Sequence, residues 1–131
     1  MEKITKGIVL SGLFIFLIPS YLFGLVYIGN LNTSKFEQNS VHNEFGSYGN
    51  PFSPLSINNK FGIYGSDFSV YSVNNPYAFY APKLFDVNGV YLGKLSANKF
   101  DVESISNPMS IYKNMVLQRY NIVIIQIYGQ G

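Results

Sequence analysis

The chain has 131 residues, of which 47% are hydrophobic, 12% are charged and none is cysteine, and its formal net charge is +2. The length suits one small domain, and the few scattered basic residues exclude the clustered positive face of a nucleic-acid-binding protein. Without cysteine, the sequence also excludes disulfides, thiolate metal sites and lipid attachment through cysteine.

The N-terminal segment is apolar and long enough to cross a membrane. No charged residue occurs between Gly7 and Ser34, and residues 8–28 are mostly Leu, Ile, Val, Phe and Gly. A membrane-spanning helix needs about 20 such residues, and Lys3 and Lys6 place its start in the cytoplasm. We predict a retained signal anchor with residues 8–26 in contact with the membrane. A cleaved signal peptide and a buried helix of a soluble fold are the alternatives.

A 16-residue repeat organises residues 36–112. Its phenylalanines each stand four residues before a serine that begins the tetrapeptide Ser-(Val/Ile)-x-Asn, and they are Phe36, Phe52, Phe68 and Phe100. The asparagines that end the tetrapeptides are Asn43, Asn59, Asn75 and Asn107. A longer phrase, Tyr-(Ile/Leu)-Gly-x-Leu at 27–31, recurs at 91–95, four repeat lengths later.

The repeat predicts both turns and packing. Residues 53–59 and 69–75 read Ser-x-x-Ser-(Val/Ile)-x-Asn, which is typical of turns closed by serine and asparagine side chains. Short repeats bury a core between neighbouring copies, so we expect the repeat phenylalanines to be packing residues. The remaining copy has Leu84, which keeps apolar bulk without the ring and favours the same interpretation.

A β-hairpin and one further strand are predicted after the third copy. Residues 83–95 read as a β-hairpin, with Asn88-Gly89 as a type I′ turn between β-forming residues. Residues 120–128 are β-branched and apolar, which predicts a buried or edge strand, or an aggregation-prone tail. The predicted fold class is therefore an N-terminal apolar α-helix plus a small loop-rich β module, with little regular secondary structure outside the hairpin.

The predicted organisation has three parts. Residues 1–26 form the signal anchor or signal peptide, residues 27–112 form the exported repeat module with the hairpin 83–95, and residues 113–131 form a divergent C-terminal strand or tail. No catalytic, cofactor or metal constellation is predicted. His42 lacks partners at ligand spacing, Asp86 to Gly89 is favoured as a turn over a calcium loop, and Asp101 and Glu103 are expected to be a solvated pair.

The best candidates for surface aromatic contacts are four tyrosines that share one phase of the repeat and keep ring and hydroxyl: Tyr48, Tyr64, Tyr80 and Tyr112. Exposed aromatic side chains can stack on sugars or contact a partner protein. For the aromatic periodicity as a whole, internal packing between copies is favoured over a ligand surface, and low-complexity disorder is a further alternative.

The string at residues 56–77, Ser-Ile-Asn-Asn-x-Phe-Gly-x-Tyr-Gly-Ser through Asn-Asn-Pro-Tyr, resembles a group of small uncharacterised bacterial exported proteins. These carry Asn-Pro-Tyr-Gly and Tyr-Gly-Ser repeats and Tyr-Leu-Gly-x-Leu hairpins, and the resemblance covers residues 27–108. It implies an exported bacterial repeat protein and brings no activity. This chain departs from the group after Pro108, where another copy would follow.

Together these features predict a non-enzymatic bacterial envelope protein with a structural or protein-interaction role and no cofactor. A carbohydrate-binding module that uses the repeat aromatics is the alternative function. The expected location is extracytoplasmic, anchored by the N-terminal segment, or secreted or periplasmic if that segment is cleaved. The partner, protein or glycan, is not specified by the sequence.

Overall fold

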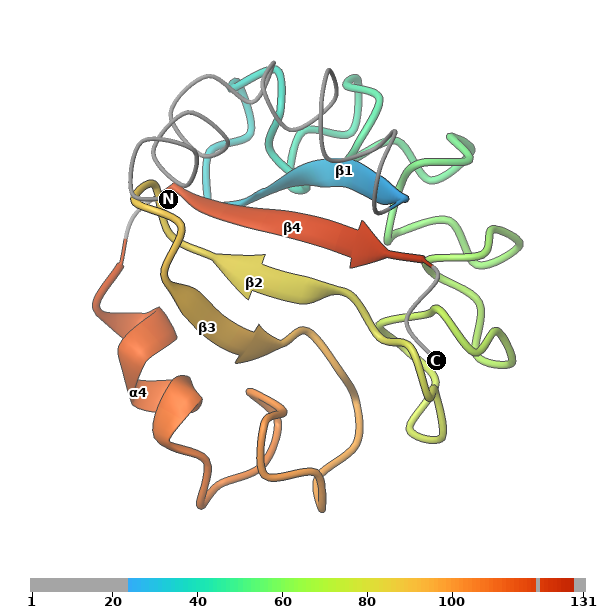
Figure 1. The fold of residues 1–131 in the computed structure, drawn as a ribbon. Coiled ribbons are helices and arrows are strands. Elements are labelled where there is room, and N and C mark those ends of the chain that lie inside the picture. The colour runs from blue at the N-terminus through green and yellow to red at the C-terminus, as the bar shows by residue number, and fades with distance from the viewer. Residues whose placement is uncertain (1–23, 120, 129–131) are drawn as a thin grey trace.

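A four-stranded antiparallel sheet forms the centre of the computed structural model, which describes residues 24–119 and 121–128 (Figure 1). The strands are β1 (Leu25–Leu31), β2 (Lys83–Phe85), β3 (Tyr91–Lys94) and β4 (Ile122–Ile127), in the spatial order β1-β4-β2-β3. Every neighbouring pair is antiparallel. One short helix, α4 (Ile111–Leu117), begins at the N-cap Ser110.

The predicted fold class is wrong. Little regular secondary structure was expected outside the hairpin, but the hairpin is one half of a sheet completed by β1 and β4. Leu25 and Val26, which the sequence assigned to the apolar helix, instead begin β1. Residues 8–23 of the predicted helix lie outside the described residues. Within residues 24–119 and 121–128, no helix is long and apolar enough to cross a membrane.

The C-terminal strand β4 is central rather than a tail. It pairs with β1 on one side and with β2 on the other, and five of its six residues are buried. A run of consecutive apolar residues suits a strand that is covered on both faces. One face contributes Ile122 and Ile124 to a cluster with Ile28, Leu84 and Leu92. The opposite face packs Val123 and Ile125 against Tyr27.

The predicted hairpin is confirmed, but its turn is of a different type. β2 and β3 pair antiparallel, with Phe85 opposite Tyr91. A type I′ turn needs positive φ at both central residues, whereas only Gly89 has it, at 81°. The buried carboxylate of Asp86 accepts the backbone N–H groups of Asn88 and Val90, at 2.8 and 2.9 Å. This side-chain hydrogen bonding selects a turn that needs one left-handed residue instead of two.

The long repeat recurs in three dimensions. β1 and β3 carry the two Tyr-(Ile/Leu)-Gly-x-Leu copies, and each makes a parallel bridge to a repeat serine, Asn30 with Ser40 and Lys94 with Ser104. These strands do not pair with each other, because β4 and β2 lie between them. The copies are therefore the two edge strands of one sheet.

Consecutive turns build the segment from residue 34 to residue 81. We call its three 16-residue units wraps: residues 34–49, 50–65 and 66–81. In Figure 1 their loops follow one another from the region beside β1 to the C-terminal end of β4. Backbone hydrogen bonds recur every three residues, as in Ser56 N–H to Ser53 O and Asn59 N–H to Ser56 O, both at 3.2 Å.

Serine and asparagine side chains close these turns, as predicted. Ser53 Oγ accepts the N–H of Leu55, Ser56 Oγ that of Asn58, and Asn59 Oδ1 that of Phe61. The Asn59 side chain also donates to Ser53 O at 3.0 Å. Asn43, Asn75 and Asn107 donate to the carbonyl six residues earlier in the same way. The periodic asparagine is thus required by the hydrogen-bonding needs of the turn backbone.

A second asparagine ties each wrap to the one before it. Asn58 Nδ2 donates to Val41 O at 2.7 Å and to Gly49 O at 3.1 Å. Asn74 repeats this pattern with Ile57 O and Gly65 O. His42 occupies the same position in the first wrap, where its Nδ1 contacts Asn32 O. The variable position of the tetrapeptide therefore fixes the spacing between wraps.

Candidate functional site

The most unusual feature of the surface is a set of fully exposed phenylalanines. Of the eight phenylalanines in the described part of the chain, seven are at least 83% exposed, and Phe85 in β2 is the exception. Phe36, Phe52 and Phe68 are 94, 85 and 90% exposed. The prediction that the repeat phenylalanines are packing residues is wrong.

The turn geometry explains why the rings face outward. The serines that open the tetrapeptides, Ser40, Ser56, Ser72 and Ser104, have no exposed surface. The inner side of each wrap must satisfy the backbone groups of tight turns, so it is occupied by short polar side chains. A ring placed there would displace those hydrogen bonds. The phenylalanine two residues after the turn-closing Ser or Asn projects to the outside instead.

The exposed rings form two rows, which we define by their place in the turn. The first row is Phe36, Phe52 and Phe68, whose N–H groups are accepted by Ser34, Asn50 and Ser66. The second row is Phe45, Phe61 and Tyr77, whose N–H groups are accepted by Asn43, Asn59 and Asn75. Each wrap thus contributes one ring to each row, at a spacing held by the asparagines between wraps.

The four candidate tyrosines are placed differently from one another. Tyr64 is only 3% exposed, and its hydroxyl is 2.6 Å from that of Tyr128. Tyr48 and Tyr112 are half-buried, with edge-on rings packed on Tyr27 and Tyr91 at 5.0 and 5.2 Å. Tyr80 is 41% exposed and is the most accessible of the four. The structure therefore does not bring these tyrosines together as one contact surface.

The buried tyrosines make the fold sensitive to alkaline pH. Burial raises the pKa of Tyr64 above its ordinary value, and the hydrogen bond with Tyr128 raises it further. Burial also raises the pKa of Tyr27, and burial together with the bond to Glu103 raises that of Tyr91. The pKa values of these tyrosines in the folded chain exceed the value of about 10 in the unfolded chain. The contribution of the three neutral hydroxyls to the stability of the fold is therefore complete below about pH 10 and is lost as the pH rises above it.

We therefore expect the free energy of unfolding to fall steeply above about pH 10. Urea titrations at a series of alkaline pH values, with tyrosinate absorbance as a second signal, measure this directly. Tyrosinate absorbance should appear together with unfolding for the buried groups. A free energy of unfolding that increases as the pH is raised past the ordinary tyrosine pKa would contradict this assignment.

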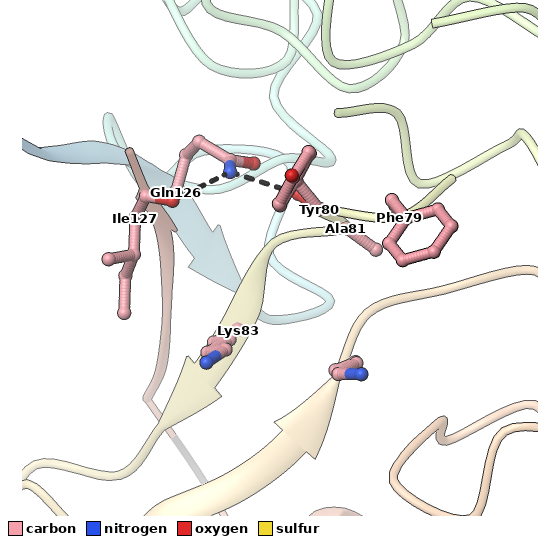
Figure 2. Close-up of a pocket in the computed structure, with 7 residues that line it drawn as sticks. Phe79, Tyr80, Ala81, Lys83, Gln126 and Ile127 are labelled. Atoms are coloured by element: carbon pink, nitrogen blue, oxygen red, sulfur yellow. Dashed lines mark hydrogen bonds between the residues drawn. The ribbon is translucent and has the colours of Figure 1, made fainter. Parts of the chain in front are cut away.

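A small pocket lies where the third wrap meets the sheet (Figure 2). Its lining residues are Phe79, Tyr80, Ala81, Lys83, Lys94, Gln126 and Ile127. Gln126 Nε2 donates to Tyr80 O at 2.9 Å and to Ile127 O at 3.3 Å. Its Oε1 is buried without a hydrogen-bond partner among the described residues. The Gln126 amide therefore fixes the third wrap to β4.

Lys94 at the edge of this pocket is already paired. Its Nζ lies 2.9 Å from Asp101 Oδ2 and 4.0 Å from Glu103 Oε2, and Tyr91 donates to Glu103 Oε1 at 2.6 Å. Burial alone would raise the pKa of Asp101, but hydrogen bonds from Lys94 and the Glu103 backbone outweigh it and lower the pKa. Asp101 and Glu103 are thus bound to neighbouring side chains, in contrast to the freely solvated pair that was expected.

No group of three His, Asp or Glu side chains is arranged to hold a metal ion in residues 24–119 and 121–128. The exposed ring of His42 contacts the backbone carbonyl of Asn32, which lies just before the first wrap. Among the described residues, the phenylalanine rows are therefore the strongest candidate for a functional surface. The sequence contained a signal for them, since every ring of the first row stands two residues after a turn-closing Ser or Asn.

Comparisons with known proteins found no family model, no curated protein and no solved structure that matches this chain. The functional proposal is therefore argued from the sequence and the structure of the chain itself.

Proposed function

We propose that this chain is a non-enzymatic protein-interaction module of the bacterial envelope, and that its phenylalanine rows contact another protein. The observation that supports this most strongly is the exposure of Phe36, Phe52 and Phe68, at 94, 85 and 90%. Burial of one phenylalanine side chain stabilises a structure by about 1.5–3 kcal/mol. A regular series of exposed rings is thus a surface that gains much free energy when a partner covers it.

The rows are also preorganised for binding. Backbone turns fix each ring's attachment point, and the amides of Asn58 and Asn74 fix the spacing between wraps. A rigid surface loses little conformational entropy on association, so more of the apolar burial appears as affinity. Aromatic side chains of this kind are enriched at the energetic centres of protein interfaces.

Export and membrane attachment complete the proposal. They are supported by the uncharged apolar residues 8–23, which precede β1 in the sequence, and by the lysines before them. The resemblance of residues 56–77 to bacterial exported repeat proteins supports the same location. In such an envelope protein the rows would face a partner outside the cytoplasm, while the apolar residues before β1 would hold the chain at the membrane.

Site-specific photocrosslinking in cells that produce the full chain tests the proposal. A benzophenone amino acid replaces Phe52 in one variant and Asn88, an exposed residue of the hairpin turn, in a matched control. We expect discrete protein adducts from position 52 and none from position 88. The absence of adducts at 52, 61 and 68 would overturn the proposal. Sedimentation of the purified chain with cell-wall polysaccharide, lost on Phe52→Ser, would favour the carbohydrate-binding alternative instead.

A further inference from the structure

We infer that the first row is covered by the same row of a second copy of this chain, with the two rows antiparallel. The inference rests on the proposed function, because it names the protein that the phenylalanines contact. Any partner of the row must present apolar groups at the spacing of the wraps. A second copy has that spacing by construction.

The charges beside the rings select the antiparallel arrangement. The residues that directly precede the first-row rings are Lys35, Pro51 and Asp67. They share one position in the turn, because each follows the Ser or Asn that accepts the ring residue's N–H. At this position the row is therefore positive at its first wrap, neutral at its second and negative at its third. The Glu37 carboxylate on the other side of Phe36 accepts a hydrogen bond from Asn32 Nδ2 at 2.8 Å.

When two copies pair antiparallel with Phe52 at the centre, each ring of the row faces a ring of the other copy, and each charged residue faces one of opposite charge. Phe36 then faces Phe68 of the second copy, and Lys35 faces Asp67 of that copy. Parallel pairing in register would place Lys35 against Lys35 and Asp67 against Asp67, which is repulsive. Electrostatic complementarity of this kind fixes the register of an interface more than its affinity.

The second row does not have this property. Its rings follow Glu44, Lys60 and Pro76. Antiparallel pairing of all three rings would place Lys60 against its own equivalent and leave Glu44 opposite a proline. The first row is therefore the one whose side chains complement a second copy.

The Asp67 carboxylate is accessible for this contact. Its only ion pair within the described residues is with Lys60 Nζ at 3.9 Å, and both side chains are more than 60% exposed. An exposed ion pair of this length contributes little to stability. A lysine from a second copy can therefore approach Asp67 without breaking a strong interaction.

Cysteine crosslinking tests both the partner and its direction, since the natural chain has no cysteine. Full-length Lys35→Cys and Asp67→Cys chains carrying different tags are produced in one cell and treated with a mild oxidant. We expect a mixed disulfide dimer when both variants are present, and much less dimer when either is present alone. Asn88→Cys, also exposed, is the matched control and should give little dimer.

Dimers of Lys35→Cys with itself that exceed the mixed dimer would overturn the antiparallel arrangement. Reversing the charges at positions 35 and 67 provides a second test, and because both side chains are exposed the variants should keep their fold. Lys35→Asp should reduce the homodimer adduct formed by the benzophenone at position 52, and adding Asp67→Lys should restore it. Adducts at position 52 that contain only a different protein would overturn self-association and leave the proposed function standing. Loss of every adduct would overturn both.

Discussion

Leu84→Ala should lower the free energy of unfolding by about 2–5 kcal/mol, the usual loss when a buried leucine is truncated. Leu84 has no exposed surface and packs in the cluster that includes Ile28, Leu92 and Ile124. It also forms the centre of β2, with Ile124 opposite it on β4. Since β2 joins the two halves of the sheet, the cavity would open at the middle of the core.

Phe68→Ala is the matched control, because Phe68 stands one repeat length before Leu84 in the sequence. Its ring is 90% exposed, so the variant should unfold within about 0.5 kcal/mol of the natural chain. Urea denaturation monitored by circular dichroism measures both variants under one set of conditions. If Phe68→Ala lowers the free energy of unfolding as much as Leu84→Ala does, the Phe68 ring is packed in the folded protein and this account is wrong.

Gly93→Ala should destabilise the fold nearly as much as Leu84→Ala, because the backbone at Gly93 does not suit a residue with a Cβ. Gly93 in β3 has a φ of 91°, a conformation that L residues rarely adopt. A Cβ there would lie 2.6 Å from Glu103 O and 2.7 Å from Tyr112 Cβ. Backbone strain of this kind costs about 1–3 kcal/mol before any clash is counted. We expect a lower melting temperature and weaker hydrogen-exchange protection of the hairpin.

Gly62→Ala provides the comparison for that variant. Its φ is not positive, and an added Cβ would first meet the Asn59 side chain at 3.1 Å. The third wrap already has an alanine, Ala78, at the equivalent position. The melting temperature of Gly62→Ala should therefore change little. Equal destabilisation by the two substitutions would contradict this account, which attributes the effect at Gly93 to its positive φ and to the close approach of Glu103 and Tyr112.

The local features of this fold could be predicted from the sequence because they depend on neighbouring residues. Ser53, Ser56 and Asn59 were identified as turn-closing side chains, and each accepts the expected backbone N–H. The hairpin also follows from local β-forming residues and Gly89. Its turn type was missed, because the pattern Asn-Gly does not show that Asp86 would accept two backbone N–H groups.

The long-range features could not be predicted, because periodicity does not reveal which side of a turn is inside. Leu84 keeps the phase of the repeat, and that equivalence suggested a buried ring in every copy. In the structure Leu84 lies in a strand, whereas the first-row phenylalanines lie in turns whose interiors hold serine and asparagine. The apolar composition of β4 fitted a buried strand, an edge strand or a tail, and only its pairing with both β1 and β2 decides between them.

Hydroxyl-radical footprinting of the full chain over a dilution series tests the central claim most directly, namely that the first row is outside the fold. In the most dilute sample, Phe36, Phe52 and Phe68 should be modified nearly as fast as in the urea-unfolded chain, while Tyr64, at 3% exposure, stays protected. As the concentration rises, the three phenylalanines should become protected and Asn88→Phe, placed in the exposed hairpin turn, should not. Phenylalanines that are as protected as Tyr64 in the most dilute sample would contradict the account.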